Sequence, residues 1–452
     1  MEIKIMRKTF SILIALAITF AMFSAVAADT PAPGGPFNSA FRVQNLDTTD
    51  AKCSYKFYDD KGAEAYASAE TTVKPGDSLY VYVPDIDDPN FDAGSYSGLV
   101  TCDKVVAAVS NFSDADSGAS HSAISTPGLK WYAPGIYDNY YDYYSNVVVQ
   151  NATPNPVDIT LKIYEPGKST PVLNETKTAV PGYAAVSFEQ AGKSELKDKQ
   201  FYSAVIEGTG VVAPIVNIYG GEGSNVDNQL YSYNPFTAGS KKAYAPVIMN
   251  NYYGYDSALV IQNIDTADAT VKVTYTDGSS KTYTIGPGAA ESIHTPTQSG
   301  LPAGNTLYGA TVESTNDKNI VVLVNESNNY NRAASYSGFA GGSQEVRAPI
   351  VMKRYYDYNT SVTCQNIGAS ATTMTIAYAG VTGTTTSPSI AVGGTHLFYQ
   401  PGESQLNDDW IGSATITANQ DVVCVVNEDM NEPPKQTDIM DQLYAYNGIE
   451  GQ

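Results

Sequence analysis

The stretch TVKVTYTDGSSKTYTIGPG, from Thr270 to Gly288, contains the pattern that decides the fold. Apolar and polar residues alternate from Val271 to Tyr275 and again from Lys281 to Ile285. A period of two places one set of side chains on a buried face of a strand. Asp277-Gly278 separates the two runs and favours a tight hairpin turn. The stretch therefore predicts a half-buried β-hairpin that ends in a second turn at Pro287-Gly288.

This second turn recurs through the chain at a fixed spacing of 106 residues. The turn centres are Pro75-Gly76, Pro181-Gly182, Pro287-Gly288 and Gly393-Gly394. A Gln-Asn pair that closes an early apolar run keeps the same order, at Gln44-Asn45, Gln150-Asn151, Gln262-Asn263 and Gln365-Asn366. Self-similarity at a fixed period indicates repeated structural units. The predicted organisation is a signal peptide (1–27) and four units (28–128, 129–240, 241–345 and 346–452).

The pattern inside each unit predicts β structure. About seven short strands per unit, separated by Gly, Pro, Asn and Asp turns, fit a two-sheet sandwich of immunoglobulin-like size. The 34 tyrosines also favour strands. A continuous β-solenoid is the second choice, but the period is too long for one coil. We therefore predict an all-β fold of four tandem immunoglobulin-like β-sandwiches.

The N-terminus has the layout of a secretory signal peptide. Lys4, Arg7 and Lys8 precede a short apolar run, and Ala25 and Ala27 occupy the small positions of a cleavage site. We expect cleavage after Ala27 and an exported protein of the cell surface or extracellular space. The apolar run is shorter than the ~20 residues that cross a bilayer, so no transmembrane segment is expected in the mature chain.

The formal net charge of −21 limits the classes of partner. A strongly acidic chain repels nucleic acid and anionic lipid, so neither is expected to bind. Self-association, other surface proteins and glycans remain as expected partners.

Four cysteines occur, two in the first unit (Cys53 and Cys102) and two in the fourth (Cys364 and Cys424). An even number in an exported chain predicts two disulfides, one inside each end unit.

Signatures of catalysis and of cofactor binding are missing from the sequence. It has no G-x-S-x-G or H-E-x-x-H motif, no phosphate-binding loop, and only three histidines. We expect no enzymatic activity and no cofactor. One weak calcium candidate is the acidic loop of Asp85, Asp87, Asp88 and Asp92. The loop lacks the order of ligands in a calcium-binding loop, so a solvated acidic loop is the preferred interpretation.

A tyrosine-rich motif recurs near the start of units two, three and four. Its members are Tyr140, Tyr141 and Tyr143, then Tyr252, Tyr253 and Tyr255, then Tyr355, Tyr356 and Tyr358. Tyrosine combines a large rigid contact area with a hydroxyl group for a wet edge. The copies follow the domain junctions, so we interpret them first as contacts between domains. Stacking of a ligand, above all a glycan, on exposed rings is the alternative.

The segments AYAPVIMNNYYGYDSALVIQN, GSATITANQDVVCVVNE and YAYNG resemble the units of tandem-repeat surface proteins from filamentous Chloroflexi-type bacteria. The resemblance covers all four units, although the first lacks the opening segment and Tyr255 stands where Trp is common. It implies exported β-sandwich modules and little about activity.

Together these features predict a non-enzymatic structural or adhesive surface or matrix protein. Sandwiches joined by short aromatic linkers predict a semi-rigid rod that could assemble head to tail into a layer, sheath or filament. A carbohydrate-binding surface protein that uses the tyrosine clusters is the alternative.

Overall fold

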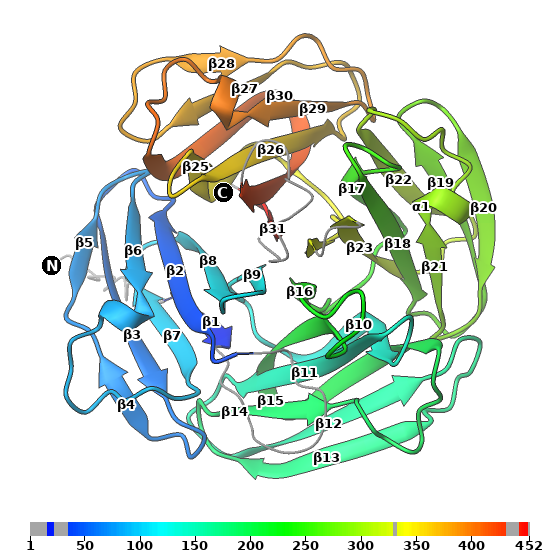
Figure 1. Cartoon of the computed structure of the whole chain (residues 1–452), viewed down its shortest axis with the longest axis horizontal. Helices are drawn as coiled ribbons and strands as arrows, with labels where there is room; N and C mark the ends of the chain where they lie inside the picture. Colours follow the sequence, from blue (N-terminus) through cyan, green and yellow to red (C-terminus); the bar gives the residue numbers. More distant parts are fainter. Residues whose placement is uncertain (1–15, 22–34, 329–331, 431–442, 451–452) are drawn as a thin grey trace, which may run out of the picture.

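The computed structural model describes residues 16–21, 35–328, 332–430 and 443–450. Strands account for 59% of the residues and helices for 2%, which confirms the predicted all-β fold of several units. Units 1 and 3 each have a separate inner and outer antiparallel sheet, whereas units 2 and 4 each form one continuous sheet with an inner and an outer part. In every unit the inner sheet or part ends in a strand at the centre of the molecule (Figure 1).

The first and third units have the same strand order. In unit 1 the strands of the inner sheet follow the order β6 (Ser78–Tyr82), β2 (Asn38–Asn45), β8 (Val106–Ser113), β9 (Gly118–Ser122). The strands of its outer sheet follow the order β1 (Leu16–Ala21), β7 (Ser97–Cys102), β3 (Ala51–Tyr58), β4 (Glu64–Ala67). The short strand β5 (Thr71–Val73) pairs with β3, and the 3₁₀ helix η1 (Val83–Asp85) follows β6. In unit 3 the strands of the inner sheet follow the order β21 (Ala290–His294), β18 (Tyr255–Asn263), β23 (Ile320–Asn328), β24 (Ala333–Ser337). The strands of its outer sheet follow the order β17 (Lys242–Ile248), β22 (Tyr308–Ser314), β19 (Ala269–Tyr275), β20 (Ser280–Ile285), and the helix α1 (Thr295–Gln298) follows β21.

In units 2 and 4 one long strand passes through both sheets. Unit 2 contains β10 (Gly128–Asp138), β11 (Tyr143–Asn151), β12 (Val157–Tyr164), β13 (Leu173–Val180), β14 (Ala185–Glu189), the long β15 (Gln200–Gly220) and β16 (Leu230–Tyr233). Unit 4 contains β25 (Ser343–Lys353), β26 (Tyr358–Asn366), β27 (Met374–Tyr378), β28 (Thr384–Thr386), β29 (Thr395–Tyr399), η2 (Gln400–Gly402), the long β30 (Trp410–Met430), β31 (Leu443–Asn447) and β32 (Ile449–Glu450).

The predicted alternation decides which side chains form each core. In β19 the residues Ala269, Val271, Val273 and Tyr275 are buried, and the polar residues between them face outward. β20 pairs with β19 through the predicted Asp277-Gly278 turn, where Gly278 has a φ of +87°. Buried strand faces form the core of each unit, and residues of the next unit join the cores of units 2 and 3.

Both predicted disulfides are present. Cys53–Cys102 joins β3 to β7, and Cys364–Cys424 joins β26 to β30. Each pair lies directly opposite on neighbouring antiparallel strands, so each bridge links strands of one sheet.

The four units form a closed ring, so the expected semi-rigid rod is wrong (Figure 1). The last strand of each inner sheet touches the last strands of both neighbouring units, in the cyclic order β9, β16, β24, β31 and back to β9. We call the contacts between consecutive units seams 1–2, 2–3, 3–4 and 4–1. Seam 4–1 brings the two ends of the repeat array together.

Polar groups at the ends of these four central strands hold the ring together. The Asn447 side chain donates to the Ser337 carbonyl, the Ser337 hydroxyl donates to the Asn234 carbonyl, and the Asn234 side chain donates to the Ser122 carbonyl. Ser120 completes the circle by donating to the carbonyl of Ala445 at 2.8 Å. Asn447, Ser337, Asn234 and Ser122 occupy matching positions of the repeat, whereas the bond at seam 4–1 joins Ser120 and Ala445, two residues earlier in their strands.

The two landmarks that identified the repeat also make contacts across the seams. They are the Pro-Gly or Gly-Gly turn and the glutamine of the Gln-Asn pair. A serine at the start of an outer strand donates to the following unit's turn: Ser97 to Tyr183, Ser203 to Gly288 and Ser413 to Gly76. The glutamine of the following unit reaches the same place, as when Gln365 donates to the carbonyls of Ala310 and Gly393. Serine and turn meet in the same way at seam 4–1 as at seams 1–2 and 2–3.

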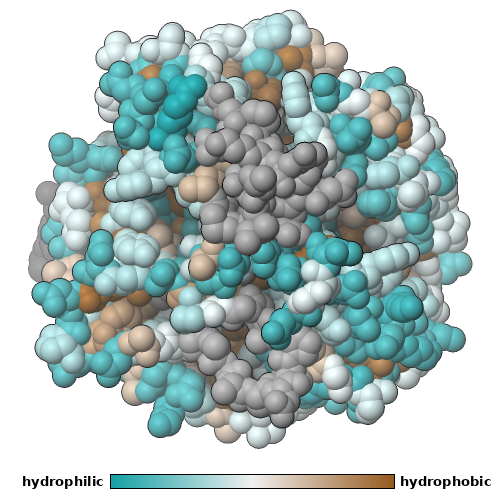
Figure 2. All heavy atoms as spheres, in the orientation of Figure 1, coloured by the Kyte–Doolittle hydropathy of each residue, from teal (hydrophilic) through white to brown (hydrophobic). Residues whose placement is uncertain are grey.

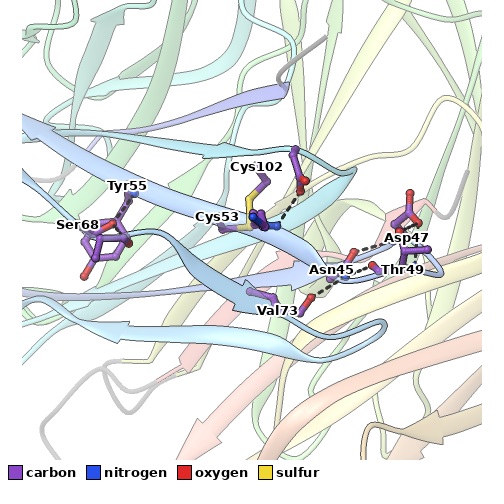
Figure 3. Close-up of a disulfide and its surroundings, with 11 residues drawn as sticks. Asn45, Asp47, Thr49, Cys53, Tyr55, Ser68, Val73 and Cys102 are labelled. Carbon is purple, nitrogen blue, oxygen red and sulfur yellow. Dashed lines mark hydrogen bonds between the residues drawn. A yellow bond between two sulfur atoms is a disulfide. The ribbon is translucent and has the colours of Figure 1, made fainter. Parts of the chain in front are cut away.

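The asparagine of each Gln-Asn pair acts inside its own unit. Asn45 donates to the carbonyls of Thr49 and Val73, close to the Cys53–Cys102 bridge (Figure 3). Asn151, Asn263 and Asn366 make the matching bonds. Each asparagine is fully buried, so it pairs backbone groups that would otherwise be buried without a partner.

Units 2, 3 and 4 each begin with an opening strand, β10, β17 or β25, that lies on the outer sheet and contacts the inner sheet of the next unit. A bulge interrupts each opening strand after an Ala-Pro pair. One buried tyrosine binds both backbone groups of the next residue: Tyr233 with Gly135, Tyr336 with Val247 and Tyr446 with Ile350. We call these three residues the tyrosine clamps.

Unit 1 differs in its opening strand. β1 lies in the corresponding place, antiparallel to β7, with Leu16 opposite Cys102 and Ala21 opposite Ser97. The strand register puts His121 where the other units have a tyrosine clamp. β1 belongs to the segment that the sequence assigns to the signal peptide, and the rest of that segment lies outside the described residues.

The visible face of the ring is largely hydrophilic (Figure 2). Within the described residues, no helix is long and apolar enough to cross a membrane.

Candidate functional site

The three tyrosine motifs form the same tight turn, which we call the tyrosine turn (Tyr140–Tyr143, Tyr252–Tyr255 and Tyr355–Tyr358). Its first and last residues exchange backbone hydrogen bonds. Its second residue has a positive φ: 52° at Tyr141, 50° at Tyr253 and 48° at Tyr356. Positive φ at both central residues defines the hairpin turn whose twist matches the strands. This conformation is uncommon for a bulky residue, and such strain concentrates at functional sites.

The second tyrosine of each turn extends into solvent. Tyr141 is 75% exposed, Tyr253 62% and Tyr356 76%. Each packs edge to face on the half-buried first tyrosine, with ring centroids 4.7–4.9 Å apart. The backbone thus holds a rigid aromatic pair outward on three units.

The third tyrosine of each turn lies deeper. The Tyr255 hydroxyl of unit 3 donates to Asp429 of unit 4 at 3.1 Å, which is a contact across a seam. Tyr143 donates to Gln229 inside unit 2, and the Tyr358 ring packs near Tyr444 inside unit 4. One motif therefore holds both kinds of residue that the sequence left as alternatives: a seam contact at Tyr255 and exposed rings beside it.

One tyrosine turn faces a cavity at seam 4–1, which we call the closing cleft. The cavity has a volume of about 220 Å³. Unit 4 supplies Tyr355, Tyr356, Tyr358 and Tyr444, and unit 1 supplies Tyr80 and Tyr82. Tyr80 is 46% exposed and Tyr82 37%, so both rings are open to a ligand.

The floor of the closing cleft is polar. Arg42 lies under the Tyr80 ring, 5.2 Å from its centroid, and donates to the Ser78 hydroxyl. Asn111 donates to the Glu428 carboxyl at 3.0 Å. Arg42 Nε, Asn111 Oδ1 and Glu428 Oε1 have no hydrogen-bond partner among the described residues. Buried polar groups are rarely left without a partner, so this floor is suited to a polar ligand.

Burial controls the charge of Glu428. It raises the pKa of Glu428 to about 8, although the hydrogen bond from Asn111 and the charge of Arg42 act in the opposite direction. The carboxyl is therefore mostly protonated at neutral pH and can donate an O–H as well as accept.

A local change in sequence explains why the cleft lies at this seam. Arg42 precedes Asn45 by three residues, and the corresponding residues of the other units are Val148, Val260 and Thr363. At seam 2–3, Val260 packs into the core of unit 2. Arg42 cannot fill that apolar role, so the unit 4 side of the seam stays open beside it.

The other predicted candidates do not form a site. Asp85, Asp87, Asp88 and Asp92 do not converge, and no group of three or more possible metal ligands occurs in the described part of the chain. Asp88 instead accepts the backbone N–H of Asn90 within its loop. Of the three tyrosine turns, only that of unit 4 lines the closing cleft.

Sequence reasoning missed Arg42, Tyr80, Tyr82, Asn111 and Glu428. Two signals were available: Arg42 is a charge in an apolar strand position, and Glu428 stands in the run VVCVVNE. Tyr80 and Tyr82 gave no signal because they meet unit 4 only when the ring closes.

No family model and no curated protein sequence matches the chain. Among solved structures, one described as "Crystal Structure of Thermotoga maritima 1070" is similar at 13% identity with a TM-score of 0.21, and the match covers 25% of this chain and 95% of that chain.

Proposed function

We propose that the protein is an exported, non-enzymatic recognition protein of the cell surface or extracellular space, and that the closing cleft binds a carbohydrate. The observation that carries this proposal is the combination of six tyrosine rings with a floor of polar atoms that lack partners among the described residues. A sugar ring presents C–H faces to aromatic rings and hydroxyl groups to polar side chains. Ligand sites typically combine an apolar wall with a few fixed polar groups in this way.

The shape of unit 1 allows a ligand longer than one sugar ring. A second, shallower cavity of about 450 Å³ is also lined by Tyr80 and Tyr82, together with Tyr55 and Tyr66. Tyr80 and Tyr82 thus separate two cavities. An oligosaccharide that crosses these rings would contact both.

Binding without cleavage fits the composition of the cleft. Glycoside hydrolysis generally uses a pair of carboxyl groups on either side of the scissile bond. Glu428 carries the only carboxyl group among the described residues that line the closing cleft. This arrangement supports recognition of a sugar.

Because the four units form a closed ring, we also propose a different kind of surface protein from the rod that the sequence predicted. A closed ring does not extend along one axis, so a rod that spans a sheath or filament is no longer the favoured form. Three tyrosine turns on separate units give an adhesive role a structural basis, because several exposed aromatic pairs on one body can contact a surface together.

The test is binding of the mature chain, residues 28–452, to a glycan array, followed by substitution in the closing cleft. We expect Tyr80→Ala and Tyr356→Ala each to weaken binding about tenfold or more, as central aromatic contacts do. Tyr141→Ala is the matched control, because Tyr141 has the same turn and exposure on unit 2 but does not line the cleft. The proposal fails if no glycan binds, or if Tyr141→Ala weakens binding as much as Tyr356→Ala.

A further inference from the structure

In unit 1, the strand that pairs with the edge of β7 comes from a different part of the chain than the corresponding strands of units 2 to 4. In units 2 to 4 the outer sheet is completed by β10, β17 or β25, which belong to the folded repeat itself. In unit 1 the same edge is covered by residues 16–21, which pair with β7 from Ser97 to Cys102. These residues lie inside the segment expected to be removed on export. We call the position between β7 and the inner sheet of unit 2 the acceptor slot.

The other wall of the slot is an apolar face of unit 2. β1 contacts β11 and β15, as β10 contacts β18 and β23 at the next seam. Val148 and Ile215 form a small buried cluster on β11 and β15. Their counterparts Val260 and Leu323 pack into the core of the preceding unit. With β1 removed, the slot combines an unpaired strand edge with this apolar face, a combination that attracts an extended chain.

The sequence that follows the cleavage site is poorly suited to replace β1. The residues that follow the cleavage site contain Pro31, Pro33 and Pro36, and proline has no N–H for a ladder. Unit 1 also lacks the tyrosine clamp that would hold an opening strand, because His121 takes that position. Every other strand in the described ranges is already paired in a sheet of its own unit. Within the described residues, a second copy therefore has no unpaired strand to give.

We propose that removal of the signal peptide opens the acceptor slot, and that a different protein fills it with an extended, uncharged apolar strand that pairs antiparallel with β7. The strand must be apolar on both faces, since one side meets the core of unit 1 and the other meets Val148 and Ile215. The site continues the series of seams, in which an opening strand separates each pair of units. This proposal rests on the proposed export and is independent of ligand binding in the closing cleft.

The first measurement is the mass of the exported protein, which should correspond to a chain that begins at Ala28. The second is hydrogen exchange of this mature chain with and without a peptide of sequence ALAITFAM (residues 15–22) that carries lysines at its ends. We expect fast exchange of the amides on the free edge of β7 and clear slowing when the peptide is added. A control peptide with Ile18→Pro and Phe20→Pro should have no effect, because it cannot form the ladder.

A variant on the unit 2 wall tests the apolar face. Ile215→Lys should weaken peptide binding at least tenfold, and Val392→Lys, at an apolar position that is 55% exposed on unit 4, should not. The proposal is overturned if the exported chain retains residues 16–21, if the β7 edge is already protected without peptide, or if the mature chain is a dimer that hides it. Glycan binding in the same samples reports on the closing cleft separately, so the two proposals can fail independently.

Discussion

Replacing Glu326 and Glu428 by glutamine is expected to remove a large loss of stability between about pH 5 and pH 8. Both side chains lie at seams that hold the ring together. Asn427 of unit 4 donates to Glu326 of unit 3, and Asn111 of unit 1 donates to Glu428 of unit 4. Both carboxyl groups are fully buried, and burial raises the pKa of each to about 8.

The direction of the effect follows from proton binding. An unfolded glutamate ionises near pH 4.5, so between about pH 4.5 and 8 the folded chain holds protons that the unfolded chain has released. The free energy of unfolding therefore falls as pH rises through this window, by about 1.4 kcal/mol per pH unit for each glutamate. Across the window this amounts to roughly 5 kcal/mol per glutamate. The stabilisation is fully present below about pH 4.5 and is lost as the pH rises to about 8.

Chemical denaturation at several pH values measures this effect. Glutamine keeps an oxygen for the asparagine donor but does not ionise, so the variant should match the native protein near pH 5 and exceed it by several kcal/mol above pH 8. Glu313→Gln, at an exposed position on unit 3, is the control and should leave the pH dependence unchanged. Equal pH dependence in the native and doubly substituted proteins would show that these carboxyls are not buried at seams.

Removing one tyrosine clamp is expected to destabilise the protein by roughly 2–4 kcal/mol through the loss of a single hydroxyl. The Tyr446 hydroxyl donates to the carbonyl of Ile350 and accepts from its N–H. Both partners lie in the buried bulge of β25. Tyr446→Phe keeps the ring in place and leaves two buried backbone groups without a partner, each of which costs about 1–3 kcal/mol.

The free energy of unfolding of Tyr446→Phe checks this expectation. Tyr80→Phe is the control, because the Tyr80 hydroxyl belongs to a half-exposed ring outside the bulges. A change below about 0.5 kcal/mol for Tyr446→Phe would contradict the role of the clamp. Tyr336→Phe should have a similar effect, since Tyr336 binds Val247 at 2.7 and 3.1 Å in the same way.

The features that the sequence predicted correctly are those set by local pattern. Alternation predicted which residues of β19 are buried, whereas in β20 only Ile285 is buried and Tyr283 is half-buried. The phase of the turns predicted repeated units. The cysteine pairs could be assigned because both members fall in one unit. Each of these inferences needs only the residues of one unit.

Ring closure could not be predicted because it depends on the angle between units. The glutamine of the Gln-Asn pair and the turn that follows it were visible as landmarks, yet their role at the seams depends on which unit they touch. Ser413 and Gly76, for example, are 337 residues apart and meet only when the last unit reaches the first. The closing cleft follows from the same event, so Tyr80 and Tyr356 could not be connected in advance.

The tyrosine motif was interpreted first as a contact between domains because it follows the junctions. Within one motif, Tyr255 is buried and contacts unit 4, whereas Tyr253 is exposed to solvent. The spacing of the tyrosines in the sequence does not tell which of them is buried and which is exposed, because adjacent side chains of the turn point in different directions.

The measurement that tests the closed ring most directly is small-angle X-ray scattering of the mature chain in dilute solution. A compact body of this length has a radius of gyration of about 22 Å. Four sandwiches in a row, each with the radius of gyration expected for its length, would give about 40 Å. We expect the value near 22 Å, and a value near 40 Å would contradict the ring and with it the closing cleft.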